Sequence, residues 1–157
     1  MSPRIFIHGL ESGNQGTKSV YFREKFPDMI IPDFKGDLPT RMEKLNQVLS
    51  EKSDIIMVGS SFGGLMAVLF AMQEEARVKR IILLAPAINH LKDILKEEKM
   101  ISLPVIMYHG SNDEVIPIAE VEPVAKRTFR SLSLHVVDDD HFLHNVFTNI
   151  NWEILLD

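Results

Sequence analysis

The chain contains, between residues 54–58 and residues 65–72, the segment Gly59-Ser60-Ser61-Phe62-Gly63-Gly64. The run before it is apolar and strand-like, and the run after it has the pattern of a helix. The segment includes G-x-S-x-G, the pattern of a sharp turn that joins a strand to a helix and lifts a serine into solvent. Ser61 has glycine two positions before and two positions after it, whereas Ser60 lacks this symmetric pair. We therefore predict that Ser61 is the nucleophile at such a turn.

Length and composition indicate one globular domain over residues 1–157. The apolar content is 45% and the charged content 25%, which is ordinary for a protein that folds around one core. The 22 acidic and 17 basic residues give a net charge of -5 without a dense basic block, which disfavours binding to nucleic acid or to an anionic membrane. There is no cysteine, so disulfides, thiolate metal sites and cysteine catalysis are excluded.

The N-terminus predicts a cytoplasmic protein. Met1-Ser2-Pro3-Arg4 runs directly into a strand-like segment, residues 5–7, without the longer apolar stretch and cleavage site of a signal peptide. No run approaches the roughly 18 apolar residues that a membrane span requires. We expect no membrane association.

Short apolar runs alternate with helical patterns along the whole chain. Six runs are strand candidates: residues 5–7, 29–31, 55–58, 81–84, 105–108 and 132–137. Most are continuous, as in strands buried on both faces, while the last alternates and is typical of an edge strand. Helical spacing of apolar residues marks the intervening segments at 42–49, 62–72, 91–95, 121–125 and 142–155. This order predicts an α/β/α sandwich around a mainly parallel sheet of about six strands.

One of these helices carries a possible N-terminal signal of its own. Thr40 and Glu43 have the spacing of a capping box, which predicts a helix that begins at Thr40.

Two later loops supply partners for Ser61. A serine hydroxyl needs a histidine base, and that base needs an orienting carboxylate. The run at 105–108 is followed by a loop that contains Asp113, and the run at 132–137 is followed by His141. The chain order Ser, Asp, His is the order that accompanies G-x-S-x-G. Because parallel strands present their C-terminal ends at one edge, we predict that Ser61, Asp113 and His141 converge there.

An oxyanion hole is predicted from two backbone amides. One is the amide of Phe62, directly after the nucleophile, and the other is the amide of Leu10, in the loop after the first strand. Gly9 lets the backbone turn closely at that point.

In these motifs the chain resembles a small α/β-hydrolase-fold protein, and its first loop is similar to that of compact bacterial esterase-like members. His8-Gly9, G-x-S-x-G, Asp113 and Asp140-His141 stand in the order of that family, and the resemblance covers nearly the whole chain. It implies an α/β-hydrolase fold. The chain departs from typical members in size, because only about six strands fit, and we expect it to lack the first two antiparallel strands of larger relatives. We also expect no substantial cap, because residues 87–102 leave room for one short helix only.

Several alternatives remain open at the level of sequence. Glu114 and the run at 138–140 are other candidate acids, and His144 is another candidate base. Ser61 could be only a helix N-cap. His8 and His109 end strands before glycine, where a structural hydrogen bond is the expected role. The acidic run with its histidines has no recognised spacing of metal ligands, so we predict no metal site.

The resulting functional prediction is a serine hydrolase without a cofactor, acting on a small acyl ester or thioester. We expect a shallow, exposed site; the residues predicted to line it are Leu10, Phe62, Ile88, Val115, Ile116 and Phe142. The only partner predicted is the small acyl substrate, and the sequence does not indicate an oligomeric state. The alternative is a binding or interaction protein on the same fold whose chemistry is slow or lost.

Overall fold

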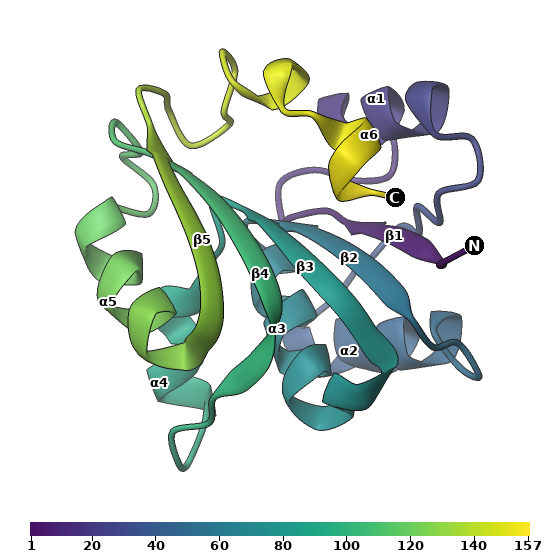
Figure 1. Cartoon of the computed structure of the whole chain (residues 1–157), viewed down its shortest axis with the longest axis horizontal. Coiled ribbons are helices and arrows are strands. Elements are labelled where there is room, and N and C mark those ends of the chain that lie inside the picture. Colours follow the sequence, from purple (N-terminus) through teal and green to yellow (C-terminus); the bar gives the residue numbers. More distant parts are fainter.

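A five-stranded sheet forms the centre of the computed structural model, which describes residues 1–157 (Figure 1). The strands follow one another across the sheet in chain order, and every neighbouring pair is parallel. The prediction of a parallel sheet is confirmed. The strands are β1 (Arg4–Ile7), β2 (Ile55–Ser60), β3 (Val78–Leu84), β4 (Ile101–Gly110) and β5 (Phe129–Val137).

Helices cover both faces of the sheet and make three layers (Figure 1). One face carries α2 (Leu38–Val48), α3 (Phe62–Glu74) and α5 (Ile118–Thr128), and the other carries α1 (Thr17–Lys25) and α6 (Trp152–Leu155). Short elements complete the chain: α4 (Leu91–Ile94) and the 3₁₀ turns η1 (Glu75–Arg77), η2 (Ile88–His90) and η3 (Phe147–Asn149). No helix has the length and apolar character needed to span a bilayer.

The continuous apolar strands feed two separate cores. Successive side chains of a strand point to opposite faces, so Met57 packs with the α3 side while Val58 packs with the α1 and α6 side. Both side chains are fully buried. Burial on both faces is the reason that these strands are apolar without alternation. In β5, at the edge, half-buried and exposed positions alternate over residues 131–135.

The sheet has one strand fewer than the six candidate runs. Residues 29–31 make only an isolated bridge, in which Ile30 donates to the Arg4 carbonyl at 2.8 Å and accepts from the Phe6 amide at 3.0 Å. The next residue on the same edge of that segment is Pro32, which has no N–H to donate. The ladder therefore stops after one pair.

The helix predicted from Thr40 begins earlier in the structure. Asp37 is the N-cap, and its Oδ1 atom accepts a hydrogen bond from the Thr40 amide at 3.0 Å. Pro39 lies in the first turn, where the missing N–H costs nothing. The predicted capping box of Thr40 and Glu43 is therefore wrong, because both residues lie inside α2.

The predicted C-terminal helix is wrong over most of its length. Residues 142–151 form turns and η3, and only α6 is α-helical. Asp139 accepts hydrogen bonds from the amides of Asn145 and Val146, both at 2.9 Å, and Leu143 has a φ of 54°. Amides that donate to Asp139 do not form the hydrogen bonds of a helix, and a positive φ interrupts a helix at Leu143. The apolar spacing alone therefore gave a wrong prediction. Helix α1 was not predicted at all.

The segment between β3 and β4 carries no cap. Only η2 and α4 lie between these strands, as the length of the segment predicted. The C-terminal edge of the sheet is therefore not roofed by an inserted domain.

Candidate active site

Ser61 lies at the sharp turn between β2 and α3. Its backbone has φ 54° and ψ -117°, a conformation that non-glycine residues rarely adopt. The flanking glycines allow the turn because β2, α3 and β1 approach closely here. A Cβ atom on Gly59 would lie 2.7 Å from the Gly64 Cα atom, and one on Gly63 would collide with the Ile7 carbonyl. These contacts give a physical reason for the glycines on both sides of Ser61.

Three loops bring the predicted catalytic side chains together at the C-terminal ends of the strands. Ser61 follows β2, Asp113 follows β4 and His141 follows β5. Ser61 Oγ lies 3.2 Å from His141 Nε2, and His141 Nδ1 lies 2.7 Å from Asp113 Oδ2. With the proton on Nδ1 donated to Asp113, Nε2 is free to accept the hydroxyl proton of Ser61.

The Asp113 carboxylate is buried and held on both oxygens. Its Oδ1 atom accepts from the amides of Val115 at 2.9 Å and Ile116 at 2.7 Å. Its Oδ2 atom faces His141, whose side chain is 11% exposed. Because Oδ1 is occupied by the loop, the carboxylate presents Oδ2 to the imidazole in one orientation.

His109 lies directly beneath this carboxylate. Its Nε2 atom donates to the Ile116 carbonyl at 2.7 Å and lies 3.3 Å from Asp113 Oδ2. Burial lowers the pKa of His109, partly opposed by the Ile116 hydrogen bond and the Asp113 charge. His109 is therefore a neutral donor that orders the loop carrying Asp113, which agrees with the structural role predicted for it.

His8 performs a comparable role beside the first loop. Its Nδ1 atom donates to the Gly9 carbonyl at 2.7 Å, and its Nε2 atom accepts from the Phe34 amide at 2.8 Å. Both ring nitrogens are used by backbone groups. The predicted structural hydrogen bond is confirmed.

The loop after β1 approaches Ser61 at Gly9. A Cβ atom there would lie 3.2 Å from the Ser61 Cβ atom and 3.8 Å from the Phe62 nitrogen. The Leu10 amide makes no hydrogen bond within the protein, and the Phe62 amide is in the first turn of α3, where helix amides lack an intrahelical acceptor. The two predicted donors thus lie on adjacent segments next to Ser61.

Backbone contacts join the loop of Asp113 to the turn of His141. The amide of Ser111 donates to the Val137 carbonyl at 2.7 Å, and the amide of Asn112 donates to the Asp139 carbonyl at 3.0 Å. A Cβ atom on Gly110 would collide with the Asp139 carbonyl. Glycine is required at this position because the two chain segments touch there.

The competing acids and base have other positions. Glu114 is exposed, and Asp138 accepts from the Asn112 side chain at 2.9 Å. Asp139 is buried and binds backbone amides, while Asp140 lies 2.6 Å from His144 Nδ1. Desolvation raises the pKa of Asp140, but the hydrogen bonds and charge of His144, together with the Phe142 amide, outweigh it and leave the pKa below its ordinary value. None of these groups hydrogen-bonds to Ser61 or His141.

Of the six residues predicted to line the site, three are exposed, two are buried and Phe62 is half-buried. Leu10, Val115 and Phe142 are 55%, 63% and 50% exposed. Ile88 is fully buried and Ile116 nearly so, since both pack in the core on the α3 side. The prediction that Ile88 and Ile116 line an open site is wrong in this structure, because they present almost no surface to a substrate.

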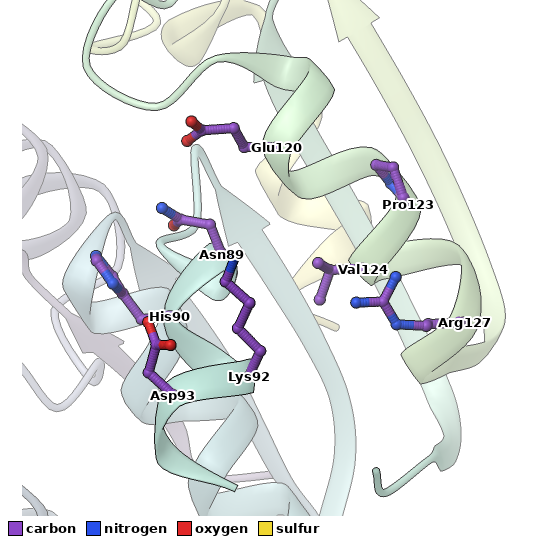
Figure 2. Close-up of a pocket in the computed structure, with 8 residues that line it drawn as sticks. All are labelled: Asn89, His90, Lys92, Asp93, Glu120, Pro123, Val124 and Arg127. Atoms are coloured by element: carbon purple, nitrogen blue, oxygen red, sulfur yellow. The ribbon is translucent and has the colours of Figure 1, made fainter.

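A hollow of about 390 Å³ lies between α5 and the segment of η2 and α4 (Figure 2). Its lining is mostly polar and charged, with both signs present: Asn89, His90, Lys92, Asp93, Glu120, Pro123, Val124 and Arg127. It includes none of the residues predicted for the site. The structure also contains no group of three His, Asp or Glu side chains placed to hold a metal ion.

Comparison with protein families gives one match, the dienelactone hydrolase family, over residues 3–138. The chain belongs to the dienelactone hydrolase family. The match spans the loop after β1, the turn at Ser61 and the loop of Asp113, and it ends just before His141. This family member is therefore an enzyme with the α/β-hydrolase fold. Comparison with curated protein sequences gave no match.

Solved structures support the same fold. A hydrolase of the α/β superfamily from Xanthomonas campestris is 25% identical with a TM-score of 0.76, and 99% of each chain is covered. Est1E from Butyrivibrio proteoclasticus is 19% identical with a TM-score of 0.80, covering 99% of this chain and 86% of that one. An esterase from Exiguobacterium antarcticum is 14% identical with a TM-score of 0.72, covering 99% and 90%. The predicted α/β-hydrolase fold is confirmed.

Proposed function

We propose that this dienelactone hydrolase family member is a serine esterase that cleaves small acyl esters or thioesters through Ser61, His141 and Asp113. The observation that carries the proposal is the continuous hydrogen-bond chain from Ser61 Oγ to His141 and from His141 to Asp113. A serine hydroxyl is a weak nucleophile until a positioned base accepts its proton. The order and spacing of these three groups suit that task.

In the proposed first step, Ser61 Oγ attacks the acyl carbonyl carbon while its proton passes to His141 Nε2. The carbonyl oxygen becomes negative, and the amides of Leu10 and Phe62 donate to it. Asp113 keeps the imidazole oriented and stabilises its charged form. When the intermediate collapses, His141 gives the proton to the departing alcohol or thiol, and the acyl group stays on Ser61.

In the second step, water attacks the acylated Ser61 and gives its proton to His141. Collapse of that intermediate releases the acid and returns the proton to Ser61. Every catalytic group in these two steps is a residue of the protein. The proposed mechanism therefore requires no cofactor.

The surroundings of Ser61 favour a small or extended substrate. Each of three loops around the site carries one exposed apolar side chain, namely Leu10, Val115 and Phe142. These side chains can contact a short acyl chain while the departing group remains in solvent. With only η2 and α4 inserted between β3 and β4, the site favours a short acyl chain over a long one. Est1E, which shares the fold, is described with ferulic acid bound.

A fluorophosphonate probe tests this proposal because it forms a covalent bond only with an activated serine. We expect the wild type to be labelled at Ser61, as located by mass spectrometry, and to hydrolyse p-nitrophenyl acetate. Ser61→Ala should abolish both reactions without changing the thermal midpoint. Ser60→Ala is the matched control, and it should still be labelled.

The competing proposal is a binding protein on the same fold with lost or slow chemistry. A wild type that neither reacts with the probe nor hydrolyses p-nitrophenyl esters from acetate to butyrate would favour it over the esterase.

A further inference from the structure

Lys18 occupies an unfavourable position for a lysine. It lies in the first turn of α1, where the partial positive charge of a helix N-terminus repels a cation. Burial lowers the pKa of Lys18, and the charges of Asp140 and Asp139 oppose that effect. A surface lysine elsewhere on the helix would avoid both costs. A specific contact of the ammonium is therefore needed to offset the desolvation and the repulsion by the helix dipole.

That contact is made with the turn that carries His141. Lys18 Nζ donates to the Phe142 carbonyl at 2.8 Å, although 124 residues separate the two in the chain. It also lies 5.4 Å from the centre of the Phe147 ring, within the range of a cation–π interaction. The ammonium is thus directed at the residue immediately after the proposed base.

The Phe142 backbone is held at both of its polar atoms. Its amide donates to Asp140 Oδ1 at 3.0 Å, and its carbonyl accepts from Lys18. The next residue, Leu143, is fully buried and has a φ of 54°. The Lys18 bond therefore holds the peptide group that leads into this strained residue, and it restricts the backbone on the C-terminal side of His141.

Helix α1 is itself tied to the loop that carries the proposed oxyanion donor. Ser19 Oγ donates to the Gly13 carbonyl at 2.9 Å, and the Gly16 amide donates to the same carbonyl at 3.1 Å. Lys18 stands between these two residues. Helix α1 thus contacts the loop after β1 through Gly16 and Ser19, and the turn after β5 through Lys18.

We propose that Lys18 is a positioning residue for His141. Through its hydrogen bond to the Phe142 carbonyl, Lys18 holds the turn that carries His141, the histidine turn, against α1. This inference rests on the proposed esterase function. Lys18 touches the turn and not the reacting atoms, so its removal should loosen the placement of the imidazole relative to Ser61. Small misplacements of catalytic groups reduce turnover strongly, by roughly 100-fold for about 1 Å.

Lys18→Met and Lys18→Arg test the inference, because methionine keeps an unbranched stem without the ammonium and arginine keeps a donor. We expect Lys18→Met to lower kcat for p-nitrophenyl acetate by roughly 10- to 100-fold, with KM within about threefold of wild type. Lys18→Arg should recover most of that loss. The matched control is Lys99→Met, since Lys99 also donates to a backbone carbonyl, that of Met72, but precedes the N-terminal end of β4, at the edge of the sheet opposite the loops of the site. It should leave kcat within about twofold.

Three results would overturn the inference. The first is a kcat of Lys18→Met within twofold of wild type, and the second is a rise in KM at unchanged kcat, which would make Lys18 a substrate contact. The third is an equal loss of kcat in Lys18→Arg and Lys18→Met.

A measurement without turnover separates this inference from the proposed function. In protein labelled with ¹⁵N on histidine, the ring resonances of His141 should broaden or shift in Lys18→Met and remain unchanged in Lys99→Met. If the wild type fails to react with the fluorophosphonate, the esterase proposal fails while these resonances still report on the turn. Unchanged His141 resonances in Lys18→Met would instead reject the role of Lys18.

Discussion

His141 Nδ1 lies 2.7 Å from Asp113 Oδ2, and the side chain of Asp113 is completely buried. The loop amides of Val115 and Ile116 occupy Oδ1, so the imidazole meets a single, oriented oxygen. This pairing determines which nitrogen of His141 faces Ser61. A histidine held by a flexible or hydrated carboxylate would have no such preference.

Asp113→Asn tests that relationship. The amide can donate a hydrogen bond to His141 Nδ1, which would favour the tautomer that has its proton on Nε2 and cannot accept from Ser61. We expect kcat for p-nitrophenyl acetate to fall on the order of 10⁴-fold, with little change in the overall fold. Asp138→Asn makes the same chemical change at an exposed neighbour and should retain near wild-type activity. Full activity in Asp113→Asn would show that another group orients His141.

Gly63→Ala tests the close packing of β1 against the turn at Ser61. The added Cβ atom would collide with the backbone carbonyl of Ile7 in β1, which cannot move without disturbing the sheet. We expect the free energy of unfolding, measured by urea denaturation, to fall by about 1–3 kcal/mol or more. In Gly16→Ala the nearest atom to the new Cβ is Ser12 Cβ at 3.2 Å, so a smaller loss is expected. Equal stability of the two variants would contradict the packing argument.

His109 predicts a pH dependence of stability. Burial lowers its pKa below the ordinary value of 6.5, so the unfolded chain takes up a proton at a pH where folded His109 is still neutral. Proton uptake by the unfolded chain favours unfolding. The contribution of His109 is therefore fully present above about pH 6.5 and declines as the pH falls below it, until the folded pKa is reached.

His109→Gln should remove that part of the pH dependence, since glutamine does not titrate and its amide can still donate to the Ile116 carbonyl. The measurement is the urea midpoint of both proteins between pH 7.5 and pH 4.5. The difference between wild type and variant should change in favour of the variant as the pH falls. Parallel curves over the whole range would mean that His109 titrates equally in the folded and unfolded states.

Val115 predicts how the proposed site selects acyl chains. Its side chain is 63% exposed, so Val115→Ala should cost little stability. If one of its two methyl groups contacts the acyl chain, kcat/KM for p-nitrophenyl butyrate should fall about three- to fivefold, since one buried carbon group contributes roughly 0.8 kcal/mol. The acetate ester should be affected less. Ile154→Ala on α6, which is 65% exposed in the native protein, is the matched control and should alter neither rate. Equal effects on both esters would show that Val115 does not contact the acyl chain.

Local sequence was sufficient for the elements around Ser61. The apolar run of β2, the paired glycines and the apolar run of α3 predict a strand, a turn and a helix, because backbone sterics and burial act over a few neighbouring residues. The stop after Ile30 could also have been read from Pro32, since the loss of an N–H is a local property. The structure of the C-terminal segment could not be predicted in this way. Asp139 precedes the apolar pattern of that segment and accepts hydrogen bonds from two of its amides.

By itself, then, the sequence determined the parallel sheet, the strained position of Ser61 and the order in which an acid and a histidine follow it along the chain. The tertiary structure decided which of the available acids and histidines meet. Asp113 and His141 meet because the loops after β4 and β5 lie side by side, a distance that no spacing along the chain encodes. Packing likewise buried Ile88 while it left Val115 in solvent, since exposure depends on which elements cover a side chain. Lys18 reaches the histidine turn for the same reason, across 124 residues of chain.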